Sequence, residues 1–286
     1  IRHALLTKLS AHGGHIGPNL GMVEATIALH YVFNSPVDKI VYDVSHQSYA
    51  HKMLTGRKDA FLHAEEYDEV TGYTNPQESK HDFFTIGHTS TSVSLACGLA
   101  KARDLKRGRE NIIAVIGDGS LSGGEAYEGL SNAGETGTNL IVVVNDNEMS
   151  IAENHGGLYQ NLKDLRDSDG QTPCNFFKSL GLDYIYVKDG NDITALIHAF
   201  TQVKDIPRPV VVHIHTLKGK GYTLAETYKE RFHWGMPFNL ETGQPLSDGG
   251  NTEDYCNLTG KFLLEQMQKD PTVVAISSGT PAVIGF

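Results

Sequence analysis

Two short apolar runs enclose a helical pattern between Asn111 and Ile151. The first run, 112–116, ends at Gly117-Asp118-Gly119, and the second, 140–144, ends at Asn145-Asp146-Asn147. Short β-branched runs of this kind are typical of strands buried in a parallel sheet. The pattern therefore predicts a strand–helix–strand unit with polar groups where each strand ends. Ligands of open α/β sheets bind at those carboxyl ends.

Asp118 and Asn147 carry the chemistry that we expect at this edge. They lie 29 positions apart, about one βαβ unit, and neighbouring strands are about 4.8 Å apart. A carboxylate, an amide oxygen and a backbone carbonyl suit Mg²⁺, which usually shares its ligand shell with phosphates. Gly119 would let a phosphate approach the backbone, beside a helix N-terminus that favours anions. Gly-Asp-Gly alone is often a tight turn, and the Asn-containing turn after the next strand favours the metal site.

Composition narrows the class of protein. The 286 residues are 40% hydrophobic and 20% charged, as in a globular protein. A net charge of −10 argues against nucleic-acid binding as the main function, although it leaves room for a local basic pocket. Three widely spaced cysteines favour a reducing compartment and hence the cytoplasm. The sequence has no apolar window of about 18 residues and no secretory signal, so we expect no membrane span.

The rest of the chain alternates between strand-like and helix-like segments, as in a parallel sheet. Polar residues 68–81 and 161–175 indicate loops, and we expect the first to form a loop or mobile lid over the site. Thr89 and Ser90 are natural N-caps for the helix that follows them. The further expected strands are 39–43, 184–187, 210–215 and 272–277, and the expected helices are 1–10, 22–33, 48–54, 93–106, 125–133, 176–180, 193–203 and 253–268.

Six segments, in order along almost the whole chain, resemble the 1-deoxy-D-xylulose-5-phosphate synthase family of the transketolase superfamily. They are HGGHIGPNLGMVEATIALHYVFNSP, YDVSHQSYAHKMLTGR, GHTSTSVSLACGLA, GDGSLSGGEAYEGLSNAG, NDNEMSIAENHGGL and HTLKGKGY. The resemblance implies a doubly wound, mostly parallel α/β sheet with helices on both faces, and a homodimer. It also implies thiamine diphosphate and Mg²⁺ as cofactors. One departure is Ser45, which stands where the family usually has glycine.

The resemblance also assigns residues to roles. His15, His46 and His233 would lie at the substrate or the reacting end of the cofactor, and which of them moves protons stays open. Asp118, Asn147 and the carbonyl of Met149 would hold Mg²⁺. The remaining cofactor contacts would be His46, Gly87, His88, Thr89, Gly119, Ser120, Asn147 and Tyr222. Lys218 and Lys220, each beside a glycine, could cradle a diphosphate or form a solvated turn.

The implied organisation is a diphosphate- and Mg²⁺-binding domain over 1–238, a linker over 239–252, and the start of a pyrimidine-binding domain over 253–286. In this superfamily a glutamate of the second domain hydrogen-bonds the aminopyrimidine of the cofactor, and no residue here matches it. Because the last predicted strand stops within that domain, we expect a longer chain rather than a split subunit. Residues 161–175 also look trimmed where many family members have an insertion.

The leading hypothesis is a transferase that condenses pyruvate with glyceraldehyde 3-phosphate and releases CO₂ to make 1-deoxy-D-xylulose 5-phosphate. The first alternative is a transketolase, or a subunit of a split transketolase, since the central motif is shared. The second is a non-catalytic protein that keeps the fold to bind a nucleotide or a partner.

Overall fold

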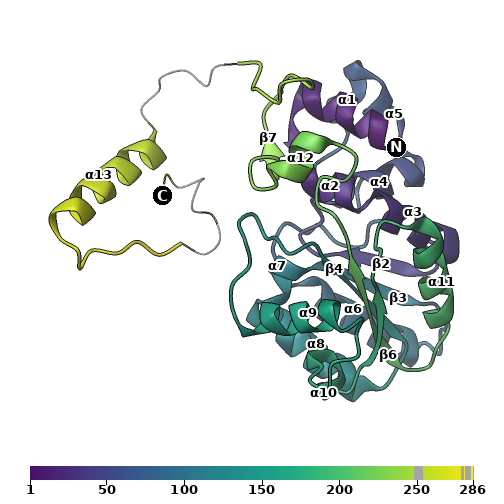
Figure 1. The fold of residues 1–286 in the computed structure, drawn as a ribbon. Coiled ribbons are helices and arrows are strands. Elements are labelled where there is room, and N and C mark those ends of the chain that lie inside the picture. The colour runs from purple at the N-terminus through teal and green to yellow at the C-terminus, as the bar shows by residue number, and fades with distance from the viewer. Residues whose placement is uncertain (248–253, 278–279, 281–284, 286) are drawn as a thin grey trace.

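The computed structural model describes residues 1–247, 254–277, 280 and 285. Figure 1 shows a body built around one sheet, with the last helix set apart from it. The helices are α1 (Arg2–His12), α2 (Gly17–Gly21), α3 (Val23–Val32), α4 (Tyr49–Lys52), a π-helical turn (Met53–Arg57), α5 (Asp59–Leu62), a 3₁₀ turn (Ala64–Glu69), α6 (Ser92–Leu105), α7 (Asp118–Leu121), α8 (Gly124–Thr136), α9 (Gly157–Asp167), α10 (Phe176–Ser179), α11 (Ile193–Val203), α12 (Thr223–Thr227) and α13 (Tyr255–Lys269).

The central sheet confirms the predicted architecture. Its five strands are all parallel and run in the order β2-β3-β4-β6-β5. They are β2 (Lys39–Tyr42), β3 (Ile112–Gly117), β4 (Leu140–Asp146), β5 (Asp183–Val187) and β6 (Pro209–His215). The motif strands β3 and β4 are neighbours, with Gly117 paired to Asn145. The ends of the two strands therefore deliver their polar residues to one edge, as the strand–helix–strand pattern predicts.

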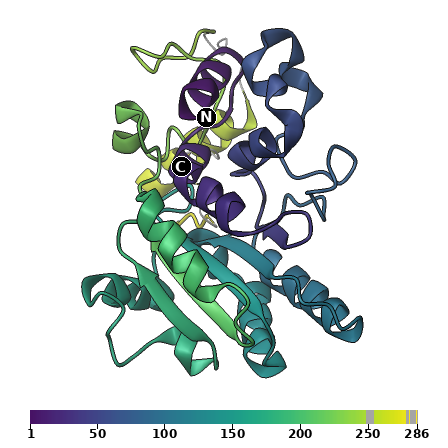
Figure 2. The same ribbon diagram turned by 90° about the vertical axis from the view of Figure 1, so that its right-hand side faces the viewer.

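Helices cover both faces of the sheet because the strands are apolar on both sides. Ile113 and Val115 of β3 point into a core shared with α3 and α11. Ile112 and Ala114 point the other way, toward α6, α8, α9 and α10. This alternation follows from the two-residue period of a strand, and burial on both faces explains why the strands are continuous apolar runs. Figure 2 shows α11, in green, lying across one face.

A third cluster of buried side chains packs the N-terminal helices above the sheet. In this cluster α1 and α2 pack against Phe232 and Phe238, which come from a much later part of the chain. A two-stranded antiparallel sheet lies beside it, made of β1 (Gly14–His15) and β7 (Trp234–Gly235). Residues separated by more than 200 positions thus meet next to the carboxyl edge of the main sheet.

Several local expectations are wrong. Residues 161–167 of the expected 161–175 loop belong to helix α9, because Leu158, Leu162 and Leu165 recur at helical spacing and pack on the sheet. Thr89 and Ser90 do not cap α6, since the N–H groups of Ser90 and Ser92 donate to the Asp43 carboxylate.

The C-terminal segment also differs from the expectation. Residues 272–277 form no strand, because no other strand of the described residues lies beside them to complete a ladder. Residues 239–247 fold back as a turn on the body, where Leu246 N–H donates to the Pro237 carbonyl. Residues 248–252 of the expected linker lie outside the described residues, so the domain boundaries stay a prediction. Among the described helices, none combines the length and apolar character needed to cross a bilayer.

Candidate functional site at the carboxyl edge of the sheet

A cavity of about 490 Å³ lies at the carboxyl ends of β3 and β4, within the usual size range of small-molecule sites. The structure brings most of the predicted site residues to it. They are His15, His46, Thr89, Asp118, Gly119, Ser120, Asn147, Met149 and His233. Gly87, His88 and Tyr222 are absent from its described lining. Gly87 and His88 are exposed before α6, and the Tyr222 hydroxyl donates to the Leu240 carbonyl at 2.9 Å.

Asp118 is a buried carboxyl group of the cavity, with 1% of its surface exposed. One carboxylate oxygen accepts a hydrogen bond from Asn154 Nδ2 at 2.8 Å. Burial and the neighbouring Asp146 carboxylate raise the pKa of Asp118 well above its usual value. Such a group is costly to ionise without a cation.

Asn147 and Met149 lie on the turn that follows β4. The Asn147 side-chain oxygen accepts from Met149 N–H at 3.3 Å, which closes the turn. Across from this turn, a Cβ atom on Gly119 would come within 2.3 Å of Ser150 Oγ. Glycine is therefore required at position 119 by the close approach of the two loops, a reason that the sequence did not reveal.

No group of three or more His, Cys, Asp or Glu side chains in the described ranges is arranged to hold a metal ion. The predicted ligand set is of another kind, with one carboxylate, one amide and one carbonyl oxygen, and it stays a prediction.

Three histidines form a cluster on the other side of the cavity. The ring centroids of His15 and His46 are 4.8 Å apart, those of His46 and His233 5.3 Å, and those of His15 and His233 5.7 Å. Pairing of β1 with β7 brings His233 beside His15, since Ile16 N–H donates to the His233 carbonyl at 3.2 Å. The structure thus brings the three histidines together, and their roles stay a prediction.

Burial keeps these histidines neutral near pH 7. It lowers the pKa of His15 to about 4 and that of His233 to about 3, and it holds the pKa of His46 well below its usual value. The Nδ1 atoms of His46 and His233 are buried and have no hydrogen-bond partner among the described residues. A neutral imidazole with a free ring nitrogen can donate a hydrogen bond to a bound molecule or accept one from it.

Sequence reasoning left Lys218 undecided, and the structure places it in the cavity wall with 2% of its surface exposed. Its Nζ donates to the Ser150 carbonyl at 2.5 Å. Burial lowers the pKa of the Lys218 amine to about 8, partly offset by the charge of Asp118. The ammonium group of Lys218 can therefore make a charge-assisted contact with an anion in the cavity. The sequence signal was a lysine beside a glycine, three positions after the end of β6.

Asn19 and Asp43 are further residues that sequence reasoning missed. Asn19 Nδ2 donates to the carbonyl groups of His15 and His46, both at 2.8 Å, so it fixes two of the three histidine loops. Asp43 accepts from Ser90 N–H at 2.8 Å and from Ser92 N–H at 2.9 Å and lines the cavity. Neither role follows from local sequence.

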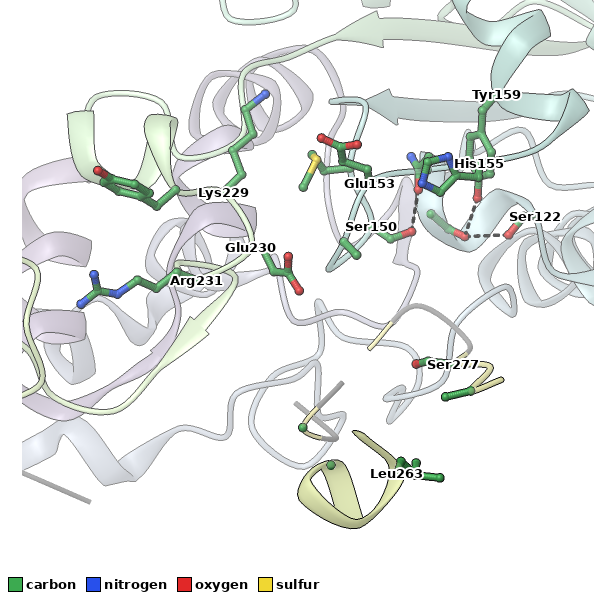
Figure 3. A pocket seen from close by; sticks show the side chains of 18 of the residues that line it. Ser122, Ser150, Glu153, His155, Tyr159, Lys229, Glu230, Arg231, Leu263 and Ser277 are labelled. Carbon is green, nitrogen blue, oxygen red and sulfur yellow. Dashed lines mark hydrogen bonds between the residues drawn. The ribbon is translucent and has the colours of Figure 1, made fainter. Parts of the chain in front are cut away.

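A wider opening of about 1880 Å³ adjoins the cavity and shares Gly119, Ser122, Met149 and Ser150 with it. Figure 3 shows the labelled side chains around this opening, which come from Ser122, from the segments Ser150 to Tyr159 and Lys229 to Arg231, and from Leu263 of α13 and Ser277. The Tyr159 hydroxyl donates to the Gly119 carbonyl at 3.4 Å, which ties α9 to the motif turn.

The fold resembles solved transketolase structures. A transketolase from Leishmania mexicana is 19% identical, with a TM-score of 0.65 and coverage of 99% of this chain and 47% of that one. One from Campylobacter jejuni is 19% identical, with a TM-score of 0.63 and coverage of 99% and 43%. At this identity the likeness shows the fold alone, and it confirms the thiamine-diphosphate-binding fold class that the sequence predicts.

Sequence comparison gives a closer match. Proteins named 1-deoxy-D-xylulose-5-phosphate synthase from Caldanaerobacter subterraneus and Geobacter metallireducens are each 41% identical over 322 aligned positions, which cover the whole of this chain. The chain spans 51% and 52% of their lengths, so about half of each relative has no counterpart here. The 322 aligned positions exceed the 286 residues by 36, so the relatives also carry residues that this chain lacks.

A family model described as 1-deoxy-D-xylulose-5-phosphate synthase matches residues 1–173 and 167–216. The two matched segments meet between α9 and α10, at the stretch that looked trimmed. The family model matches most of this chain, and the named relatives match all of it. The chain therefore belongs to the 1-deoxy-D-xylulose-5-phosphate synthase family.

Proposed function

We propose that this chain supplies the diphosphate-binding half of an enzyme that condenses pyruvate with glyceraldehyde 3-phosphate, with thiamine diphosphate and Mg²⁺ as cofactors. The observation that supports this proposal is that Asp118, Asn147 and three neutral histidines line one and the same cavity. Family membership supports the same reaction, because relatives named for the product match the whole chain.

The residues of the cavity fit the proposed cofactor. A buried carboxylate with a raised pKa needs a cation beside it, and Mg²⁺ held by Asp118, Asn147 and the Met149 carbonyl would meet that need. The ammonium group of Lys218 would face the diphosphate, whose charge it offsets. Gly119 and Ser120 would contact the same group. When bound, thiamine diphosphate supplies the electron sink for breaking the bond next to the pyruvate carbonyl.

The chain's own contribution at the reacting end is to orient the substrate and exclude water. His15, His46 and His233 present neutral rings, so their ring nitrogen atoms can hydrogen-bond a carbonyl or hydroxyl group without adding charge. Asn19 fixes the backbone of two of these loops, and preorganisation of this kind lowers the cost of reaching the reactive geometry.

The proposal also includes a homodimer and a cytoplasmic enzyme, as expected for the family. The pyrimidine side of the site would come from the part of the relatives that has no counterpart in this chain. Pyruvate, the aldehyde and the dimer partner are therefore proposed for the native protein as a whole.

The test is CO₂ release from pyruvate by the native full-length protein, with thiamine diphosphate and Mg²⁺, with and without glyceraldehyde 3-phosphate. We expect release that requires the aldehyde. Absence of release, together with transfer of a two-carbon unit from ketose phosphates, would reject the proposal in favour of a transketolase. Absence of both activities would leave a binding protein of this fold.

A further inference from the structure

The segment from Gly72 to Ile86 has little regular structure, yet parts of it are well buried. Thr74, Asp82 and Ile86 are each less than 9% exposed. In the absence of a helix or sheet ladder, this loop is held by side-chain contacts to the body. It passes close to the histidine cluster, where the Tyr73 ring centroid lies 6.0 Å from that of His15.

One anchor of the loop is a buried ionic cluster. The Asp82 carboxylate accepts hydrogen bonds from His51 Nε2 at 2.8 Å and from the Arg57 guanidinium at 2.6 and 3.0 Å. Glu78 accepts from Lys52 Nζ at 2.5 Å. Breaking such buried pairs is costly because it leaves one charge unpaired, so this end of the loop is fixed to α4 and the π-helical turn.

The second anchor is the hydroxyl group of Ser45. It accepts from Thr74 N–H at 3.0 Å and donates to the Ile86 carbonyl at 2.9 Å. The Ser45 side chain is fully buried, so these two bonds join both ends of the 74–86 segment to the residue that directly precedes His46.

Ser45 adopts a strained backbone to make these bonds. Its φ is +70°, next to Val44 at +56°, a region that glycine occupies without strain. Non-glycine residues persist there only where the surroundings fix them, often near functional sites. A glycine would adopt this φ without strain, and what serine adds at this position is the hydroxyl group.

We propose that the Ser45 hydroxyl is a latch that fixes the 72–86 loop, so that Tyr73 supports His15 in the histidine cluster. Ser45 and Tyr73 are then positioning residues, since both act on the site through His15 and His46. The loop is then a fixed support behind the histidine cluster rather than a mobile lid. The catalytic consequence rests on the proposed function, whereas the latch itself does not.

Hydrogen–deuterium exchange on the full-length protein tests the latch. We expect Ser45→Ala to speed amide exchange within 72–86 by about tenfold, the effect of losing two buried hydrogen bonds. Ser45→Gly should do the same without backbone strain, and it replaces Ser45→Ala if that variant fails to fold. The matched control is Ser92→Ala, because the Ser92 hydroxyl is equally buried but has no partner among the described residues. Unchanged exchange in 72–86 in the folded Ser45 variants would overturn the proposal.

Kinetics test the role of Tyr73. We expect Tyr73→Ala to lower kcat/KM for CO₂ release by about tenfold, since small displacements of a site group are costly, with thiamine diphosphate affinity within about twofold of wild type. Tyr73→Phe keeps the ring and should behave like wild type. Full activity of Tyr73→Ala, or equal damage in Tyr73→Phe, would reject the positioning role. If the native protein releases no CO₂, the proposed function fails, and the exchange experiment still decides the latch.

Discussion

Asp146 is the residue whose contribution to stability can be worked most directly from the structure. It is buried at the end of β4, directly before Asn147. Its carboxylate accepts a hydrogen bond from His213 Nε2 at 2.9 Å and pairs with the Arg166 guanidinium. His213 Nδ1 in turn accepts from the Tyr184 hydroxyl at 2.7 Å. This network holds the turn that carries the predicted metal ligands.

The network lowers the pKa of Asp146. Burial alone would raise it, but the hydrogen bond from His213 and the charge of Arg166 bring it down to about 2, from 3.8 in an exposed carboxyl. Because the folded pKa is the lower one, the ionised group stabilises the fold at any pH above the unfolded value. That stabilisation is lost as the pH falls from about 4 toward 2. A difference of about 1.8 pKa units corresponds to about 2 kcal/mol at pH 7.

Asp146→Asn tests this reasoning because the amide resembles the protonated carboxyl group. We expect urea unfolding to show a loss of about 2 kcal/mol at pH 7 and at pH 5, falling to about 1 kcal/mol at pH 3. Glu128→Gln on the exposed face of α8 makes the same carboxylate-to-amide change and serves as a surface control. A loss that is the same at all three pH values, or one below about 0.5 kcal/mol at pH 7, would refute the account.

Two further predictions concern the cavity wall. Asp43→Ala should destabilise the protein by about 3 kcal/mol in urea unfolding, because it leaves the N–H groups of Ser90 and Ser92 without their charged acceptor; a loss under about 1 kcal/mol would contradict this role. Lys218→Gln should weaken thiamine diphosphate binding by about tenfold or more in calorimetry, because a charge-assisted contact is lost, and unchanged affinity would remove Lys218 from the diphosphate site.

The core of the fold could be predicted from the sequence because its signals are local. The β-branched runs of β3 and β4 are buried on both faces, so they stand out against their polar ends. The pairing of these strands also follows from the length of one βαβ unit, which is why Asp118 and Asn147 meet at one cavity as expected.

Other features depend on contacts between distant segments and have no local signal. Strands β1 and β7 are two residues long, too short for any periodicity, yet their pairing brings His233 to His15. The many charged residues of α9 suggest a loop, although its leucines recur at helical spacing. The packing of those leucines on the sheet decides for the helix. In the sequence, nothing distinguishes Asn19 from any other asparagine. Only the fold places it between the loops that carry His15 and His46.

Calorimetric titration of the full-length protein with thiamine diphosphate, with Mg²⁺ and then with EDTA, tests the metal-bridged diphosphate site directly. We expect binding that requires Mg²⁺ and is abolished in Asp118→Asn, while the circular dichroism of that variant matches wild type. Binding that is unaffected by EDTA, or by the loss of the Asp118 carboxylate, would contradict the assignment of this cavity to a metal-bridged diphosphate.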